Sequence, residues 1–199
     1  MKLNEYIEIT NEDNMELMAR YPDKYFDLAL VDPPFGINIT SSGRLKRYNT
    51  SDTTWDNSTP TKEYFDELFR ISKNQIIWGG NYFIEYLKNT KCFLIYDKKQ
   101  PEGISFASCE MAWTSFDSVA KTFYYSPMQI KNRIHSCEKP VALYAWILKN
   151  YAKQGDKILD THLGSGSIAI AVHEANIIDK IDLSLVACEL DKDYFESSI

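Results

Sequence analysis

Short apolar runs alternate with helical patterns along almost the whole of this 199-residue chain. Such alternation is typical of a mostly parallel sheet whose strands are joined by crossover helices. We therefore expect an α/β fold with a mostly parallel, seven-stranded sheet and helices on both of its faces. The expected strands are residues 6–9, 28–31, 75–78, 92–96, 110–114, 157–159 and 184–188, and the expected helices are residues 14–21, 61–71, 81–87, 140–151 and 167–174.

No repeat, low-complexity tract or linker divides the sequence, so residues 1–199 are expected to form one domain. There is no secretory leader and no run of about 18 apolar residues, which predicts a cytoplasmic protein without a membrane partner. The four cysteines lie far apart without paired metal-ligand spacing, so we expect neither a metal site nor a disulfide framework.

The net charge of −6 argues against indiscriminate binding to nucleic acids, because Lys and Arg dominate affinity for the phosphate backbone. Basic residues nevertheless gather in stretches that we interpret as loops. Such clusters are more often plain solvated surface than a binding face, so by themselves they decide nothing. The clustered residues are Arg44, Lys46, Arg47, Lys98, Lys99, Lys121, Lys131 and Arg133.

The first segment that carries chemistry begins as an apolar strand and ends in Asp32-Pro33-Pro34-Phe35. Two consecutive prolines can neither donate to a sheet ladder nor continue into a helix, so they fix an extended, rigid turn. We expect this turn to hold Asp32 and Phe35 at the carboxyl end of the sheet, where open α/β folds bind ligands. The structural alternative is a stiff strand-to-loop transition with an exposed Asp and a packed Phe.

The second segment is a short strand that ends at Asp160 and is followed by a turn with Gly164 and Gly166. The glycines permit close approach of the backbone to a ligand, and the next helix presents free N–H groups. A further strand ends at Glu189, whose carboxylate is suited to bind ribose hydroxyls. This order predicts a nucleoside site. Because Ala169 is an allowed variant of the third glycine in NAD sites, spacing leaves a nicotinamide cofactor open.

Together these segments resemble the amino-methyltransferases of DNA, specifically the permuted group in which the catalytic tetrapeptide precedes the glycine motif. Asp32-Pro33-Pro34-Phe35 is similar to the family's Asp-Pro-Pro-aromatic motif. The segment from Asp160 is similar to its Asp-Pro-Phe-x-Gly-Ser-Gly-Thr motif. The departures from that motif are Thr161, His162, Leu163 and Ser167.

Three further segments extend the resemblance from about residue 6 to residue 195. Residues 11–18 are similar to the Gly-Asp segment near the family's start, and residues 135–140 to its His-Pro-Thr-x-Lys-Pro segment. Residues 188–194 match its Glu-x-x-x-x-Tyr signature. Residues 75–83 and 109–115 look like the compact phage and prophage members, or simply contain two packed tryptophans.

The resemblance implies a Rossmann-like S-adenosylmethionine-dependent methyltransferase fold with circularly permuted motif order, S-adenosyl-L-methionine as cofactor and DNA as partner. It implies methyl transfer to an exocyclic base nitrogen, and Asp rather than Ser before the prolines mildly favours adenine over cytosine. In the catalytic motif, the Asp32 carboxylate and the Pro33 carbonyl would accept hydrogen bonds from the amine, Pro34 would stiffen the turn, and Phe35 would stack on the extruded base.

On the cofactor side, the resemblance places Asp160 near the amino group of the methionine part and Glu189 at the ribose. Asp13 is a candidate for the adenine edge, or a helix N-cap. Lys139 is a candidate for the methionine carboxylate, or a surface charge. The implied cofactor-binding residues are Asp13, Asp32, Lys139, Asp160, Leu163, Gly164, Ser165, Gly166, Ser167 and Glu189.

Several alternatives stay open. Methylation of carbon 5 of cytosine is disfavoured, because it requires a cysteine nucleophile that typically follows a proline, and no cysteine here does. Other candidates are an exocyclic cytosine amine, RNA or a protein amide as substrate, a nicotinamide-dependent oxidoreductase, and a catalytically silent DNA-binding module. His135 and His162 are left outside the catalytic set. Residues 36–60 and 98–135 are the candidate target-recognition loops, and so little recognition surface suggests a homodimer.

Overall fold

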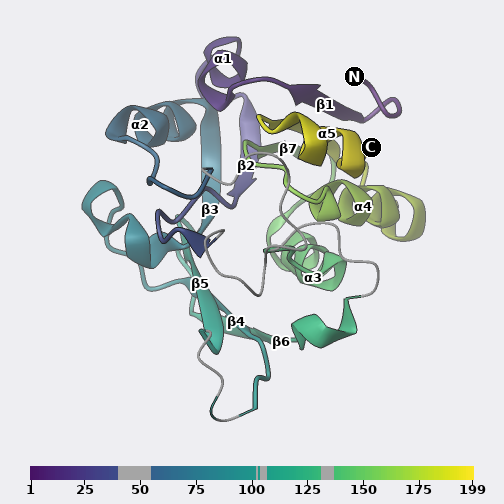
Figure 1. Ribbon diagram of the computed structural model, residues 1–199. Coiled ribbons are helices and arrows are strands. Elements are labelled where there is room, and N and C mark those ends of the chain that lie inside the picture. The colour runs from purple at the N-terminus through teal and green to yellow at the C-terminus, as the bar shows by residue number, and fades with distance from the viewer. Residues whose placement is uncertain (40–54, 102, 104–106, 131–136) are drawn as a thin grey trace.

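The computed structural model describes residues 1–39, 55–101, 103, 107–130 and 137–199. Their strands form one eight-stranded sheet in the order β1-β8-β7-β2-β3-β5-β4-β6 (Figure 1). Neighbouring strands are parallel except β5, which runs antiparallel to β3 and β4. The strands are β1 (Ile7–Asn11), β2 (Phe26–Val31), β3 (Ser72–Trp78), β4 (Phe93–Asp97), β5 (Cys109–Thr114), β6 (Lys121–Tyr124), β7 (Lys157–Asp160) and β8 (Ser184–Glu189).

The α-helices lie close to their predicted positions, and a short final helix completes the described chain. None of the helices formed by the described residues is long and apolar enough to cross a membrane. The α-helices are α1 (Asn14–Ala19), α2 (Lys62–Ile71), α3 (Val141–Tyr151), α4 (Ser167–Glu174) and α5 (Lys192–Ser198), and a π-helical turn, η6 (Ala175–Asp179), extends α4.

Two predictions about the elements are wrong. The sheet has eight strands rather than seven, because β6 pairs with β4 at the sheet edge, where its side chains stay half-buried and produce no apolar run. Residues 81–87 form two 3-10 turns, η3 (Gly80–Tyr82) and η4 (Ile84–Tyr86), instead of an α-helix. The buried Phe83 separates them with a φ of −121°, which interrupts helical geometry.

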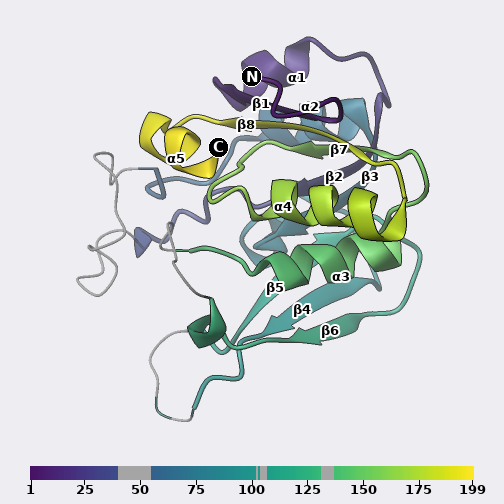
Figure 2. The same ribbon diagram turned by 90° about the vertical axis from the view of Figure 1, so that its right-hand side faces the viewer.

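The sheet is covered on both faces, as predicted, and alternate residues of β2 show how. Leu28 and Leu30 point into a core that includes α3 and α4, whereas Ala29 and Val31 point into a second core with α1 and α2. Figure 2 shows α3 and α4 packed together on one face of the sheet. Since β2 is buried on both sides, it carries the continuous apolar run expected of a central parallel strand.

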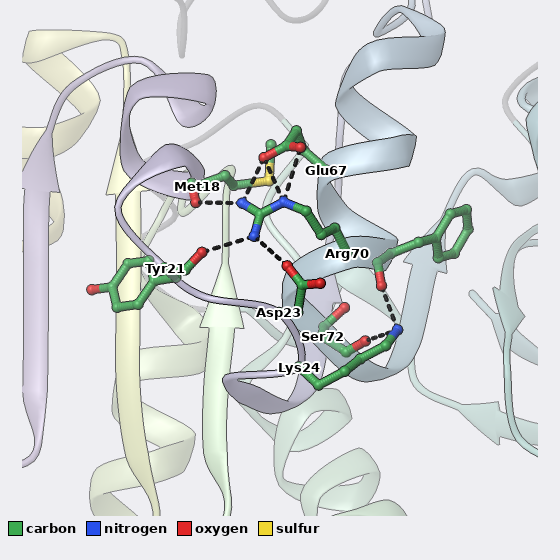
Figure 3. A network of polar contacts seen from close by, with 8 residues as sticks. Met18, Tyr21, Asp23, Lys24, Glu67, Arg70 and Ser72 are labelled. Carbon is green, nitrogen blue, oxygen red and sulfur yellow. Dashed lines mark hydrogen bonds and ion pairs between the residues drawn. The ribbon is translucent and has the colours of Figure 1, made fainter.

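Helix α2 is tied to the segment between α1 and β2 by a polar network centred on Arg70 (Figure 3). The Arg70 guanidinium donates to the backbone carbonyl of Tyr21 at 2.9 Å and pairs with the carboxylates of Asp23 and Glu67 at 2.9 and 2.7 Å. The ammonium of Lys24 donates to the carbonyl of Phe69. These contacts satisfy carbonyls at helix ends, where the helix itself offers no donor.

Replacing Arg70 by Ala is expected to lower the free energy of unfolding by about 1–2 kcal/mol, because backbone carbonyls and two carboxylates lose a charged donor at a partly exposed site. Urea denaturation measures the loss. Lys62→Ala removes a single exposed i,i+4 pair with Asp66 on the same helix, so it should leave the denaturation midpoint unchanged. Equal midpoints for the two variants would contradict this role of Arg70.

The topology gathers several chain segments at one edge of the sheet. The parallel strands β1, β8, β7, β2, β3 and β4 all end there. Asp32 and Lys98, which directly follow β2 and β4, and Glu189, the last residue of β8, therefore lie on the same side. Because β5 runs in the opposite direction, its beginning lies at this edge, with Glu110 opposite Tyr96 of β4.

Candidate active site

A cavity of about 1010 Å³ opens at the carboxyl edge of the sheet. It is lined by all four residues of the predicted catalytic motif and, from the glycine turn, by Leu163, Gly164 and Ser165. Glu189 at the end of β8 also lines it. Two segments more than a hundred residues apart in the sequence therefore border one space, large enough for two bound groups side by side.

Asp32 lies directly after β2 and is held from one side. Its Oδ2 accepts a hydrogen bond from the ammonium of Lys139, whereas its Oδ1 is buried without a hydrogen-bond partner among the described residues. Burial raises the pKa of the Asp32 carboxyl, and the Lys139 ammonium opposes that rise. An unsatisfied buried acceptor is costly, and an N–H donor on a ligand in the cavity would satisfy it.

Phe35 is packed into a fixed position beside the cavity. Its ring stacks on that of Tyr82, with 5.0 Å between ring centroids and an angle of 13° between planes. The Phe35 ring also lies against the backbone of Gly79, because a Cβ built on that glycine would be 2.2 Å from Cε1 of Phe35. Gly79 thus leaves the space that the ring occupies, whereas a Cβ on the next residue, Gly80, would meet Trp113.

The loop that follows Phe35 is anchored by a buried carboxylate that the sequence analysis missed. Asp56 accepts hydrogen bonds from the backbone N–H groups of Phe35, Gly36 and Ile39, each at 2.9 Å. An Asp in a polar loop about 20 residues after the prolines forms no recognisable motif with them, so the sequence did not indicate this role for Asp56. Asp56 rigidifies the turn that the two prolines begin.

The glycine turn and the end of β8 are joined through Glu189. Its Oε2 accepts from the backbone N–H of Gly164 at 2.8 Å, and its Oε1 accepts from that of Asp191 at 2.9 Å. Burial raises the pKa of Glu189, while these N–H donors oppose the rise. Since each carboxylate oxygen can accept a second hydrogen bond, the group remains able to bind hydroxyls of a ligand.

Asp160 and His162 occupy the buried side of the turn. Burial raises the pKa of the Asp160 carboxyl to about 8, although the backbone N–H of His162 donates to its Oδ1 at 3.0 Å. Burial lowers the pKa of the His162 imidazole to about 3, so this ring is neutral at pH 7. His162 lines the cavity and contacts the side chains of Asn14, at 3.2 Å, and Thr161, at 2.9 Å.

Four of the predicted cofactor residues do not line the cavity: Asp160, which is buried behind the turn, and Asp13, Gly166 and Ser167. Asp13 is the N-cap of α1, where its carboxylate accepts from the N–H of Met15, which is the structural alternative weighed for it. Gly166 has a φ of +73°, and the nearest group to a Cβ on it would be the backbone carbonyl of Ser198 in α5, at 3.0 Å. Ser167 is buried at the start of α4, with its hydroxyl 2.9 Å from that of Ser165.

Lys139 is not a surface charge. Its side chain is 4% exposed, and its ammonium also lies 3.1 Å from Oε2 of Glu110, besides its contact with Asp32. It stands 5.2 Å from the ring centroid of Trp78. This pairing favours a role beside the Asp32 carboxylate over one at a methionine carboxylate.

Parts of the predicted recognition loops and of one motif lie outside the described residues. These are residues 40–54 in the first loop, and residues 102, 104–106 and 131–136, with His135, in the second. Within the described ranges, no cluster of three or more His, Cys, Asp or Glu side chains is arranged to hold a metal ion.

Comparison with known proteins gives a family match and several solved structures of similar fold. The family model N6_N4_Mtase, described as DNA methylase, matches residues 77–199. The complex of M1.HpyAVI with SAM is similar at a TM-score of 0.60 and 17% identity, with 96% of this chain and 97% of that chain covered. The PvuII DNA methyltransferase, which is cytosine-N4-specific, has a TM-score of 0.68 at 10% identity, with 98% and 86% covered.

TTHA0409 from Thermus thermophilus, complexed with S-adenosyl-L-methionine, has a TM-score of 0.58 at 15% identity, with 97% of this chain and 92% of that chain covered. At such identities the solved structures establish that the fold is shared. The family follows from the sequence match, which spans more than half of the chain. The chain therefore belongs to the N6/N4 family of DNA methylases.

Proposed function

We propose that this chain transfers a methyl group from S-adenosyl-L-methionine to the exocyclic amine of adenine in DNA. The observation that carries this proposal is the shared cavity, in which an Asp32 carboxylate with one unsatisfied oxygen borders the same space as the glycine turn and Glu189. Membership in the DNA methylase family supports methyl transfer to DNA and leaves the nicotinamide alternative without support.

We assign the chain to the permuted group of the family, similar to its small phage and prophage adenine enzymes. The support is the order of the motifs, because the Asp32 motif after β2 precedes the glycine turn after β7. Residues 1–199 would then act as a single methyltransferase domain around one sheet.

The residues present fit the cofactor. Glu189 would hold the ribose hydroxyls and the backbone of Gly164 would border the methionine part. Asp160, buried behind the glycine turn, would lie near its amino group. Leu163 and Ser165 line the same side of the cavity. When bound, S-adenosyl-L-methionine supplies a methyl group activated by its sulfonium sulfur, so the protein need not provide a covalent nucleophile.

The residues of the catalytic motif would act by positioning and electrostatics. Oδ1 of Asp32 and the carbonyl of Pro33 accept hydrogen bonds from the target amine, which directs the nitrogen lone pair toward the methyl group. The Asp32 carboxylate would stabilise the positive charge that develops on the amine nitrogen during methyl transfer, until the nitrogen releases a proton to water. Phe35 stacks on the extruded base and offsets part of the cost of unstacking, a few kcal/mol.

Adenine and cytosine are distinguished by the product. DNA incubated with the protein and S-adenosyl-L-methionine should yield N6-methyladenine when its nucleosides are separated by liquid chromatography and identified by mass. Finding 4-methylcytosine alone would assign the chain to the cytosine type. Calorimetry with NAD in place of the methyl donor serves as the control for the cofactor, and binding of NAD only would contradict the proposal.

Cofactor binding should release a proton from Asp160. In the free protein a pKa of about 8 keeps this carboxyl protonated at pH 7, and a cationic amino group beside it would favour the ionised form. Affinity for S-adenosyl-L-methionine is therefore expected to rise with pH between about 6 and 8, by up to about tenfold per unit. Calorimetry in buffers of different ionisation enthalpy measures the released proton, and Asp160→Asn should abolish the release. Equal proton release by the variant and the wild type would exclude Asp160 from this role.

DNA would be recognised through residues 36–60 and 98–135, which flank the cavity where they are described: Trp55, Ser58 and Gln100 are among its lining residues. We further propose that two chains act together on one site, because these segments offer little recognition surface. Light scattering of the protein with DNA bound tests this, and a single chain per DNA would refute it.

A further inference from the structure

Four side chains with alternating charge meet beside the cavity. The Lys139 ammonium lies between the carboxylates of Asp32 and Glu110, and the second Glu110 oxygen, Oε1, is 2.6 Å from the ammonium of Lys98. The side chains of Asp32 and Glu110 are each 21% exposed and that of Lys98 is 16% exposed. The four charges sum to zero, which reduces the cost of holding them away from water.

The four residues come from separate parts of the chain. Asp32 follows β2, Lys98 follows β4, Glu110 belongs to β5, and Lys139 precedes α3. Glu110 reaches the network because β5 is antiparallel, which brings the beginning of that strand to the carboxyl edge. The network therefore connects the Asp32 motif with the three strands β5, β4 and β6 at one edge of the sheet.

Because Glu110 is ionised, the Lys139 ammonium is shared between the carboxylates of Glu110 and Asp32. Burial by itself raises the pKa of Glu110, but the ammonium groups of Lys139 and Lys98 lower it to about 2, so Glu110 stays ionised. Lys139 is thereby shared by two carboxylates. It engages Oδ2 of Asp32 and leaves Oδ1 open.

On the basis of the proposed methyl transfer, we infer that Glu110 and Lys98 are positioning residues for the reaction: through Lys139 they orient the Asp32 carboxylate, keep one of its oxygens open to the target amine and balance its charge. Lys98 neutralises Glu110, and Glu110 prevents Lys139 from pairing with Asp32 alone. The two residues then act on Asp32 with opposite signs.

Three further titratable groups that interact with Asp32 in the described structure are neutral near pH 7 in the free protein. Burial raises the pKa of the Asp160 carboxyl to about 8, and it raises those of the Tyr64 and Tyr144 hydroxyls above their usual range. The ionised neighbours are Lys139, Glu110 and Lys98, and these three contribute to the electrostatics of Asp32.

Two charge-removing variants test the inference. Glu110→Gln removes a negative charge, so the pKa of Asp32 should fall, and the acid limb of the pH dependence of kcat should move to lower pH. Lys98→Gln removes a positive charge, so the pKa of Asp32 should rise and the acid limb should move to higher pH. The double variant restores neutrality and should bring the limb back between the two. Because a fully paired carboxylate is a weaker acceptor, Glu110→Gln should also lower kcat by about tenfold near pH 8, with the KM for S-adenosyl-L-methionine nearly unchanged.

Rates are measured at saturating DNA, since Lys98 lies within a proposed recognition segment. Lys149→Gln, an exposed change of the same charge on α3, is the control for net charge and should leave the acid limb in place. Thermal unfolding verifies that each variant folds. If Glu110→Gln does not fold, Lys98→Gln decides the question by itself, through the direction in which its limb moves.

The titration of Asp32 in the absence of DNA separates this inference from the proposed function. Carbon NMR of protein labelled at the Asp carboxyl carbons, with Asp32→Asn for assignment, should show a lower pKa for Asp32 in Glu110→Gln and a higher one in Lys98→Gln. An unchanged pKa of Asp32 in both variants, or a pKa shift in the same direction in both, would overturn the inference. If the pKa of Asp32 shifts in opposite directions in the two variants but the wild-type protein methylates no DNA, the charge network is retained and the methyltransferase proposal is rejected.

Discussion

Replacing Asp32 by Ala is expected to reduce kcat for DNA methylation by about 10²–10³-fold or more, while the affinity for S-adenosyl-L-methionine changes by no more than about threefold. The carboxylate supplies the acceptor for the target amine and the negative charge that stabilises the developing positive charge. Its Oδ1 has no other partner among the described residues, so nothing in the fold requires that oxygen. A filter assay with labelled methyl donor measures the rate, and calorimetry measures the affinity.

Stability must be measured alongside activity for this variant. Removing the carboxylate leaves the buried Lys139 with Glu110 as its remaining partner at 3.1 Å, so some loss of stability is expected. Asp32→Asn keeps the shape of the side chain and should show a similar loss of rate with a smaller loss of stability. Asp66→Asn, an exposed change of the same type on α2, should retain the wild-type rate. A wild-type rate in Asp32→Ala would remove this residue from its assigned role.

Replacing Gly79 by Ala is expected to lower kcat/KM for DNA by about 10- to 100-fold, because the added methyl group displaces the ring on which the extruded base stacks. A Cβ at this position would lie 2.2 Å from Cε1 of Phe35, and the ring is backed by Tyr82, so it must leave its place. Steady-state kinetics gives the rate constant. Fluorescence of 2-aminopurine at the target position reports base extrusion, which should weaken.

Gly155→Ala is the matched control. Gly155 has a φ of +79°, close to the +70° of Gly79, but a Cβ there would meet nothing within 4 Å. Both substitutions carry the cost of a left-handed backbone for a non-glycine residue, about 1 kcal/mol. The difference between the two variants isolates the contact with Phe35. If both variants methylate DNA equally well, Phe35 does not hold the base.

The central strands and their turns could be predicted because they depend on local signals. The apolar run before Asp32 and the two prolines after it define β2 and its end, and the turn with Gly164 and Gly166 lies between a strand and a helix as its pattern indicates. Parallel topology then brings the carboxyl ends of these strands to one edge. The shared cavity follows from the order of the motifs.

The features that escaped prediction depend on partners distant in sequence. Strand β6 is defined by its pairing with β4, and Glu110 reaches the site only because β5 is antiparallel. Asp13 and Lys139 each had two possible roles. Local geometry made Asp13 a helix cap, whereas burial between two carboxylates made Lys139 part of the charge network.

The most direct test is a crystal structure of the protein with S-adenosylhomocysteine bound. We expect the ribose hydroxyls on Glu189, the methionine part along Gly164 and Ser165, and the sulfur facing the Asp32 carboxylate across the cavity. A ligand bound elsewhere, or a sulfur turned away from Asp32, would contradict the proposed transfer of a methyl group to a base held by this motif.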